Sequence, residues 1–314
     1  MKLAATLVVL GVAFAVGAMV LVLDRESNPQ VARDRLAATT TTPRTDPNTA
    51  PTGGVIAAMA AMPGNRVRLG ELETGIITTY NGPTVGHVDV ATGGQRGLLG
   101  LAVDENGTTY AAYTERTGAR RLVVDRVGVG AVKRVWTGPP SAARNIGGHI
   151  ALDPDGRLTI GVGDLGRPGR ADDPRFPNGK LLSLSVDGPP TQTPKVLSGG
   201  WTDPYAFAYT PGGTLWVADA AADPADQVLG RGDGAGPRTP LGRETGPSGL
   251  VALDDDTLAV CGVVSQRLDR YRIGDGDRTR FDGTISNGCT FGVVRRTDGT
   301  LLVSTAAGLV PVRP

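Results

Sequence analysis

A strand–turn–strand phrase recurs along this chain, and this repeat constrains the fold more than any other feature of the sequence. Each copy has a short apolar run, a two-residue turn and a second run in which apolar and polar residues alternate. Asn-Gly and Asp-Gly turns favour the type I′ geometry that closes a tight β-hairpin. The six turns lie at Gly64-Asn65, Asn106-Gly107, Asp155-Gly156, Gly212-Gly213, Asp255-Asp256 and Asp298-Gly299.

The spacing of these hairpins predicts the architecture. Successive turns are roughly 40 to 60 residues apart, a repeat length typical of the blades of a β-propeller. Six copies therefore predict an all-β fold with six blades. The first copy, Val55 to Tyr80, is the weakest in sequence, but without it the first and last blades would expose unpaired edges. We expect residues 55–314 to form one six-bladed β-propeller domain.

The amino-terminal segment is apolar and long enough to cross a membrane. Leu3 to Leu23 has Thr6 as its only clearly polar residue, and a helix of that length measures about 31 Å. Lys2 and the terminal amine precede it, so an uncleaved anchor leaves the amino end in the cytoplasm and the propeller outside. The alternative is a signal peptide that is cleaved after Val16-Gly17-Ala18 and releases a secreted protein.

The stretch between this segment and the first hairpin has little to bury. Residues 24–54 are rich in Thr, Pro, Asn and Asp, a composition that indicates a disordered linker. The chain is thus divided into a transmembrane signal anchor or signal peptide at 1–23, a Thr/Pro-rich linker at 24–54 and the propeller at 55–314. The formal net charge of +1 gives no electrostatic reason to expect nucleic acid as a partner.

Cys261 and Cys289 are the two cysteines of the chain. In an exported protein a lone pair favours a disulfide, here between strands of the last two repeats in neighbouring blades. The alternative is two buried free thiols, each in a strand. A zinc site is disfavoured because no matching cluster of histidines accompanies the cysteines.

Four longer phrases occur in an order known from one protein family. They read GGQRGLLGLAVDENGTTYAAYT, NIGGHIALDPDGRLTIGVGDLGR, ADDPRFPNGKLLSLSVDG and TDPYAFAYTPGGTLWVADA. These phrases resemble the soluble quinoprotein glucose/sorbosone dehydrogenases over most of Val85 to Gly308. The resemblance implies a six-bladed propeller that holds pyrroloquinoline quinone (PQQ) and calcium over its channel. It also implies oxidation of aldoses at the anomeric carbon, with a His as general base and Arg residues near the quinone.

The position of the family's base is changed in this chain. Gln95, which the resemblance places near the sugar, is kept and is followed by Arg96. The family phrase HNGGR aligns with Asn145 to His149, so Asn145 stands where the catalytic His is expected. A carboxamide cannot accept a proton at neutral pH. His149 lies four residues on, about 13 Å along an extended strand, which is too far to replace the base without rearrangement.

Other aligned positions have lost their cations. Asp164 and Arg167 of the GDxGR phrase are kept, but Thr202 and Asp203 replace the Arg and Asn of RNPQG. Neither Arg of a late RxRD phrase is present in the run Cys289 to Gly292. A tricarboxylate quinone needs compensating cations. We assign no catalytic residue, and the channel and ligand candidates are Gln95, Arg96, Asn145, His149, Asp164, Arg167 and Asp203.

These departures favour one of two functions. We expect a membrane-tethered, extracytoplasmic propeller without quinone chemistry that serves as a binding or scaffold module. Its partner would be a neutral carbohydrate or a cell-envelope component, and the membrane is reached through the N-terminal helix. The alternative is an active PQQ- and calcium-dependent sugar dehydrogenase with a rearranged site. The secondary candidates for calcium are Asp172 and Asp173.

Overall fold

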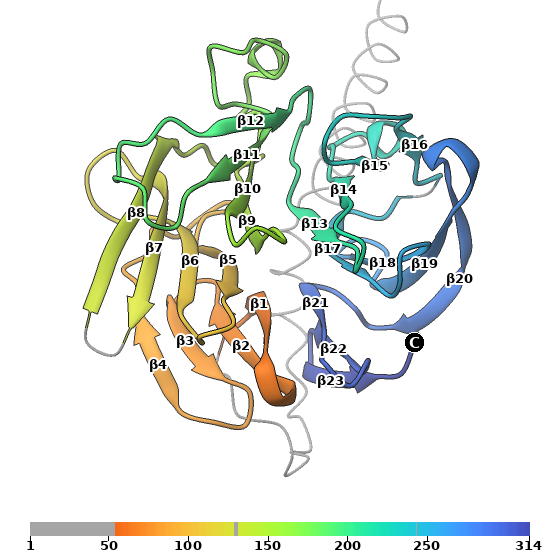
Figure 1. Cartoon of the computed structure of the whole chain (residues 1–314), viewed down its shortest axis with the longest axis horizontal. Helices are drawn as coiled ribbons and strands as arrows, with labels where there is room; N and C mark the ends of the chain where they lie inside the picture. Colours follow the sequence, from red (N-terminus) through yellow and green to blue (C-terminus); the bar gives the residue numbers. More distant parts are fainter. Residues whose placement is uncertain (1–53, 129–130, 243) are drawn as a thin grey trace, which may run out of the picture.

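Six antiparallel sheets stand in a ring around a central channel, within residues 54–128, 131–242 and 244–314 that the computed structural model describes (Figure 1). The predicted all-β, six-bladed propeller is therefore confirmed. The predicted anchor at 1–23 and nearly all of the linker at 24–54 lie outside these residues. Within the described ranges, no helix has the length and apolar character needed to cross a bilayer.

Each sheet is one blade, with its first strand innermost. Blade 1 has β1 (Ile56–Met62), β2 (Arg66–Glu71), β3 (Ile76–Thr79) and β4 (Thr84–His87), and blade 2 has β5 (Leu98–Val103), β6 (Thr109–Thr114), β7 (Arg121–Gly128) and β8 (Ala131–Pro140). Blade 3 has β9 (Gly147–Leu152), β10 (Leu158–Val162), β11 (Lys180–Leu184) and β12 (Lys195–Ser198), and blade 4 has β13 (Ala206–Tyr209), β14 (Leu215–Asp219), β15 (Val228–Arg231) and β16 (Thr239–Pro240). Blade 5 has β17 (Pro247–Ala252), β18 (Thr257–Gly262), β19 (Arg267–Ile273) and β20 (Thr279–Asn287). Blade 6 has three described strands, β21 (Gly292–Arg295), β22 (Leu301–Thr305) and β23 (Gly308–Val312).

Each predicted hairpin joins the two innermost strands of a blade, but the Asn-Gly and Asp-Gly turns differ from the type I′ geometry that we expected. In the second blade Gly107 has a positive φ of 83°, whereas Asn106 does not. Type I′ needs positive φ at both central residues. The connection is instead a wider loop in which Asp104 Oδ1 accepts hydrogen bonds from the backbone N–H groups of Asn106 and Thr108. Aspartate therefore stabilises this loop through its side chain, and only the glycine takes the left-handed conformation.

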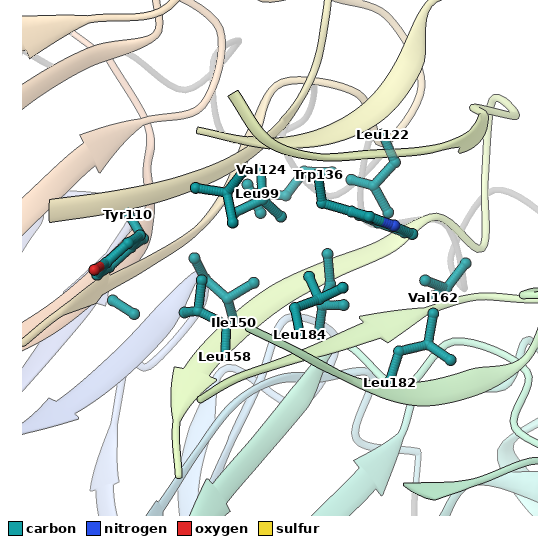
Figure 2. Packing of buried hydrophobic residues seen from close by; sticks show 14 of the residues in the cluster. Leu99, Tyr110, Leu122, Val124, Trp136, Ile150, Leu158, Val162, Leu182 and Leu184 are labelled. Atoms are coloured by element: carbon teal, nitrogen blue, oxygen red, sulfur yellow. The ribbon is translucent and has the colours of Figure 1, made fainter. Parts of the chain in front are cut away.

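Adjacent blades pack face to face through the apolar residues that alternate along their strands. Figure 2 shows this between blades 2 and 3, where Leu122 and Trp136 face Val162 and Leu182. Trp136 is 3% exposed and Leu122 is fully buried. Burial of one such side chain contributes roughly 1.5 to 3 kcal/mol. Repetition of this contact around the ring stabilises the propeller.

The ring closes between the first and last blades. Val67 and Leu69 of β2 pack with Leu302 of β22 in one buried cluster. Ser304 Oγ donates a hydrogen bond to the Ile56 carbonyl over 2.7 Å, and Asn65 Oδ1 accepts one from the Asp298 backbone N–H over 3.1 Å. The prediction that Val55 to Tyr80 contributes to a blade is therefore confirmed.

Candidate functional site

A pocket of about 110 Å³ lies at the end of the channel where the innermost strands begin. Blades 2 to 6 all contribute to it, and its lining is both polar and apolar. The polar lining comes from Gln95, Arg144, Asn145, Asp203, Ser248 and Thr290. The apolar lining comes from Leu99, Ala220, Ala221, Pro247, Val263 and Phe291. Such a mixture suits a small ligand that carries both polar and apolar surface.

Tyr205 forms the floor of this pocket. It precedes β13 in blade 4, and its hydroxyl lies 3.0 Å from the Leu99 carbonyl and 3.3 Å from the Ala57 carbonyl. The side chain thus reaches across the channel to blades 1 and 2. The opposite ends of the six innermost strands line a second cavity of about 460 Å³. Tyr205 lines the first cavity and not the second.

Close packing of the innermost strands requires glycine beside the pocket. Gly147 has a φ of 70°, and a Cβ at that position would lie 2.4 Å from the Gly161 carbonyl oxygen. A Cβ on Gly100 would lie 2.4 Å from the Gly148 carbonyl oxygen. These glycines are needed for the approach of neighbouring strands, whatever the pocket binds.

Asn145 is fixed in a network of hydrogen bonds. Its backbone N–H donates to Gln95 Oε1, and its side-chain Nδ2 donates to Asp164 Oδ1 over 3.0 Å. Asp164 Oδ1 also accepts the Gly166 N–H over 2.7 Å. The carboxamide at the position of the family's base thus serves as a donor to a carboxylate. Asn145 therefore cannot act as a general base that takes a proton from a substrate hydroxyl.

Asp203 lines the pocket through a carboxyl group that is almost completely buried. It is 4% exposed, and one of its oxygens accepts the Gly147 N–H over 2.7 Å. Burial, together with the nearby charges of Asp219 and Asp164, raises the pKa of Asp203 to about 8. The hydrogen bonds from Gly147 and Gln95 oppose this rise without cancelling it. The balance of these effects favours the protonated form of Asp203.

Asp219 stands behind Asp203 and holds the segment that presents it. Asp219 is the last residue of β14. Its carboxylate accepts hydrogen bonds from the backbone N–H groups of Thr202 over 2.9 Å and Asp203 over 2.7 Å. Burial raises the pKa of Asp219 to about 6. The sequence did not suggest this residue, because it lies at a strand end in a run that reads as ordinary core.

Four of the sequence candidates do not line the pocket, namely Arg96, His149, Asp164 and Arg167. His149 belongs to the second cavity, where its ring meets Phe207 edge-on with a centroid distance of 4.6 Å. Burial lowers the pKa of His149 to about 4, so its imidazole is neutral. Arg96 Nη1 donates to the Gly93 carbonyl over 3.3 Å, and Arg167 is an exposed residue just before the short helix η2 (Pro168–Arg170).

Arg144 is the one Lys or Arg among the described residues that line the pocket, and sequence reasoning missed it. It is exposed and stands next to Asn145 in the chain. Ser248 and Tyr205 were also missed. The serine has no motif around it, and the tyrosine was read only as part of the aligned phrase Thr202 to Ala206.

The two secondary calcium candidates lie in a loop away from the pocket lining. Asp173 pairs with Arg175 at 2.6 Å, and this partner lowers the pKa of Asp173 to about 2. Nearby, Lys180 Nζ donates to the backbone carbonyls of Ala171 and Asn178. In the described ranges no group of three or more His, Cys, Asp or Glu side chains is arranged to hold a metal ion.

Cys261 and Cys289 form a disulfide with a Cα–Cα distance of 5.5 Å, which confirms the predicted pairing. Cys261 lies in β18, but Cys289 lies in the connection between β20 and β21 and not in a strand as we expected. The connection leaves the outer edge of blade 5 and returns to the centre of the ring. The bridge therefore fixes the point at which the chain enters blade 6, directly before Thr290 and Phe291 of the pocket.

Comparison with known proteins places these features in a family. The model of the glucose/sorbosone dehydrogenase family matches residues 57–229, more than half of the chain. No curated protein sequence matches this one significantly. A solved structure from Thermus thermophilus, described as a candidate glucose dehydrogenase, is 25% identical with a TM-score of 0.67. That match covers 81% of this chain and 91% of the other.

Two further solved structures share the fold at lower identity. The PQQ-bound aldose sugar dehydrogenase of Streptomyces coelicolor is 20% identical, with a TM-score of 0.66 over 84% of this chain and 95% of the other. The apo form of the soluble aldose sugar dehydrogenase of Escherichia coli is 17% identical, with a TM-score of 0.63 over 82% and 94%. These two likenesses concern the fold alone.

Proposed function

This chain belongs to the glucose/sorbosone dehydrogenase family, and from that premise we propose that it is a binding module in which the family's quinone chemistry has been lost. One observation carries the proposal. The position aligned with the family's base holds Asn145, whose side-chain amide donates to Asp164. A donor that is already engaged with a carboxylate cannot take a proton from the anomeric hydroxyl of a sugar.

The lining of the pocket does not fit the family's cofactor. PQQ carries three carboxylates and needs cations to neutralise them. Among the described residues that line the pocket, Arg144 is the one cationic side chain, and it is exposed. The buried carboxyl group of Asp203 also lines the pocket, and Asp164 and Asp219 are buried but do not line it. We therefore derive no reaction step through a quinone.

The lining suits a small uncharged polyol or carbohydrate. A sugar ring has apolar C–H faces and polar hydroxyls, and the pocket offers Phe291 and Pro247 on one side and Asp203 on another. Ser248 Oγ is buried and has no hydrogen-bond partner among the described residues. A buried hydroxyl without a partner is rare in proteins, and a ligand hydroxyl would satisfy it.

The proposed setting is the outer face of a membrane. The apolar run Leu3 to Leu23 would anchor the chain, with residues 24–54 as the tether. The Cys261–Cys289 disulfide supports this setting, because disulfides persist in oxidising compartments outside the cytoplasm. A neutral component of the cell envelope would then be within reach of the pocket.

The rival function is an active PQQ- and calcium-dependent sugar dehydrogenase with a rearranged site, and the family match over residues 57–229 favours it. A titration of the full-length protein with PQQ and calcium chloride separates the two functions. Each lost charge-assisted contact removes about 1.5 to 3 kcal/mol, so two losses weaken quinone binding by roughly a hundredfold or more. We expect no quinone absorbance on the purified protein and no dye reduction with aldoses.

The Streptomyces coelicolor aldose sugar dehydrogenase, treated in the same way, is the positive control. We expect Asn145→His alone to remain inactive, because the cations of the cofactor site are missing as well. Quinone binding at micromolar concentration or tighter, with sugar-dependent dye reduction by the unaltered protein, would establish the dehydrogenase and overturn the binding module.

A further inference from the structure

Three carboxyl groups are buried behind one side of the pocket, and we name Asp164, Asp203 and Asp219 the acidic wall. Each is at most 4% exposed. We propose that Asp203 selects the ligand: its carboxyl group carries a proton and donates a hydrogen bond to an oxygen atom of an uncharged polyol. This inference rests on the proposed function, because it assigns the chemistry by which the same pocket recognises its ligand.

The geometry singles out Asp203 within the acidic wall. Asp164 is held from behind by Asn145 Nδ2 and the Gly166 N–H, and Asp219 is held by two backbone N–H groups. Only Asp203 lines the pocket. Its Oδ1 accepts the Gly147 N–H, and its carboxyl group also interacts with the Gln95 side chain. A proton on Asp203 relieves the repulsion among three carboxyl groups with the least disturbance of these hydrogen bonds.

Asp203 has no ion-pair partner among the Lys and Arg side chains of the described residues. No Lys or Arg of the described chain lies within ion-pair distance of any member of the acidic wall. Arg238 acts at longer range on Asp219 and favours the ionised form of that residue. Arg144 stands at the exposed rim of the pocket. Asp164 and Asp219, by contrast, both favour the protonated form of Asp203.

Burial and these neighbours raise the pKa of Asp203 to about 8, so the group is mostly protonated at pH 7. A protonated carboxyl group is a hydrogen-bond donor, whereas an ionised one only accepts. The pocket should therefore favour ligand oxygens that accept a hydrogen bond. It should bind ligand carboxylates more weakly, because these would lie close to the buried carboxyl groups of the acidic wall.

The first test measures the proton itself and needs no ligand. Infrared pH-difference spectra of the full-length protein would be compared with those of Asp203→Asn. We expect the wild type to show the C=O band of a protonated carboxylic acid at pH 7 and to lose it as the pH rises through about 8. The variant should lack this band. A wild-type spectrum without the band at pH 7 would show that Asp203 is ionised and would overturn the inference.

The second test measures ligand selection with two probes that share one carbon skeleton, neutral D-sorbitol and anionic D-gluconate. We expect sorbitol to bind more tightly at pH 7, and its affinity for the wild type to fall about tenfold between pH 7 and pH 9, as expected when one hydrogen bond is lost. In Asp203→Asn, which cannot ionise, sorbitol affinity should be independent of pH over this range.

The matched control is Asp187→Asn, which removes one exposed carboxylate from an ion pair with Arg126 far from the pocket lining. It should keep the wild-type pH dependence. A wild-type sorbitol affinity that does not change between pH 7 and pH 9 would overturn the role of Asp203 as donor. If sorbitol does not bind at any pH while the infrared band is present, the proposal that the pocket binds a polyol is refuted. The proposed role of Asp203 in ligand selection is then refuted as well. The protonated carboxyl group itself would stand.

Discussion

The two sides of the pocket are held in place by different chemistry. The acidic wall, from blades 3 and 4, is fixed by backbone N–H groups that donate to buried carboxyl groups. The opposite side, from blades 5 and 6, is fixed by the Cys261–Cys289 bridge, which precedes Thr290 and Phe291. We name Cys261, Cys289, Thr290 and Phe291 the disulfide wall.

The difference between the walls indicates how each responds to its surroundings. Carboxyl groups titrate, so the acidic wall depends on pH, whereas a disulfide does not titrate and depends on redox conditions. Both walls occupy positions where the family resemblance places residues of a quinone site. Under the proposed function, polar but cation-poor chemistry replaces that site on one side, and a covalent bond replaces it on the other.

The largest effect that separates the walls is expected from Asp203→Asn. The folded-state pKa of Asp203, about 8, exceeds its unfolded value of about 4. Its contribution to stability is therefore fully present below pH 4 and is lost as the pH rises to about 8. The variant lacks this loss, so it should be more stable than the wild type by about 5 kcal/mol at pH 8 and about equally stable at pH 4.

Urea denaturation of both proteins at intervals from pH 4 to pH 9 measures this difference. The titration of Asp219 is present in both proteins, so the difference isolates Asp203. A constant gap between the two stability curves over this range would contradict the buried proton.

Removal of the disulfide should have the next largest effect. Cys261→Ala with Cys289→Ala opens a bridge between residues 28 positions apart, which lowers the free energy of unfolding by about 3 kcal/mol in the chain-entropy model. This loss of stability should be the same at pH 5 and pH 8, whereas the effect of Asp203→Asn on stability should change with pH. Urea denaturation at both pH values checks the prediction. Labelling of the denatured, unreduced wild type should find no free thiols, and two labelled thiols per chain would refute the bridge.

The floor between the walls should show a smaller effect. Tyr205→Phe removes the hydroxyl that reaches the Leu99 carbonyl across the channel, and the stability loss should be about 1 kcal/mol. Tyr209→Phe is the matched control, since its hydroxyl bonds to Thr159 Oγ1 over 2.7 Å, away from the pocket. We expect similar losses of stability but weaker sorbitol binding only in Tyr205→Phe. Equal sorbitol binding in the two variants would show that Tyr205 does not shape the pocket.

The smallest effect on stability is expected at Ser248. Its buried Oγ has no partner in the described part of the chain, so Ser248→Ala should change the free energy of unfolding by no more than about 0.5 kcal/mol. Sorbitol affinity should nevertheless fall about tenfold. Ser265→Ala is the control, because that Oγ is also buried without a described partner but does not line the pocket. Calorimetry that finds the same sorbitol affinity in both variants would remove Ser248 from the site.

Some features of this protein follow from local sequence. The hairpin repeat predicts six blades because a strand pair is specified by residues that are close in the chain. The cysteine pairing was predictable because the chain has two cysteines, which leaves one intramolecular partner for each. The turn type was wrong because Asp104 uses its side chain to hold a wider loop, and the sequence of the turn alone does not distinguish the two geometries.

The site depended on contacts between distant residues. Gln95, Asn145 and Asp203 were found because they align with family phrases, whereas Ser248, Tyr205 and Asp219 carry no motif. Arg167 belongs to an intact family motif, but it does not line the pocket.

Sequence by itself determined the repeat, the disulfide partners and the absence of a histidine at position 145, since each is a property of residue identity and spacing. The tertiary structure alone decided that Tyr205 crosses the channel and that Asp203 is buried beside two other carboxyl groups. The raised pKa of Asp203 comes from the loss of water around it and from charges on separate blades. Desolvation of this kind exists only after the ring has closed, so no reading of adjacent residues could have supplied it.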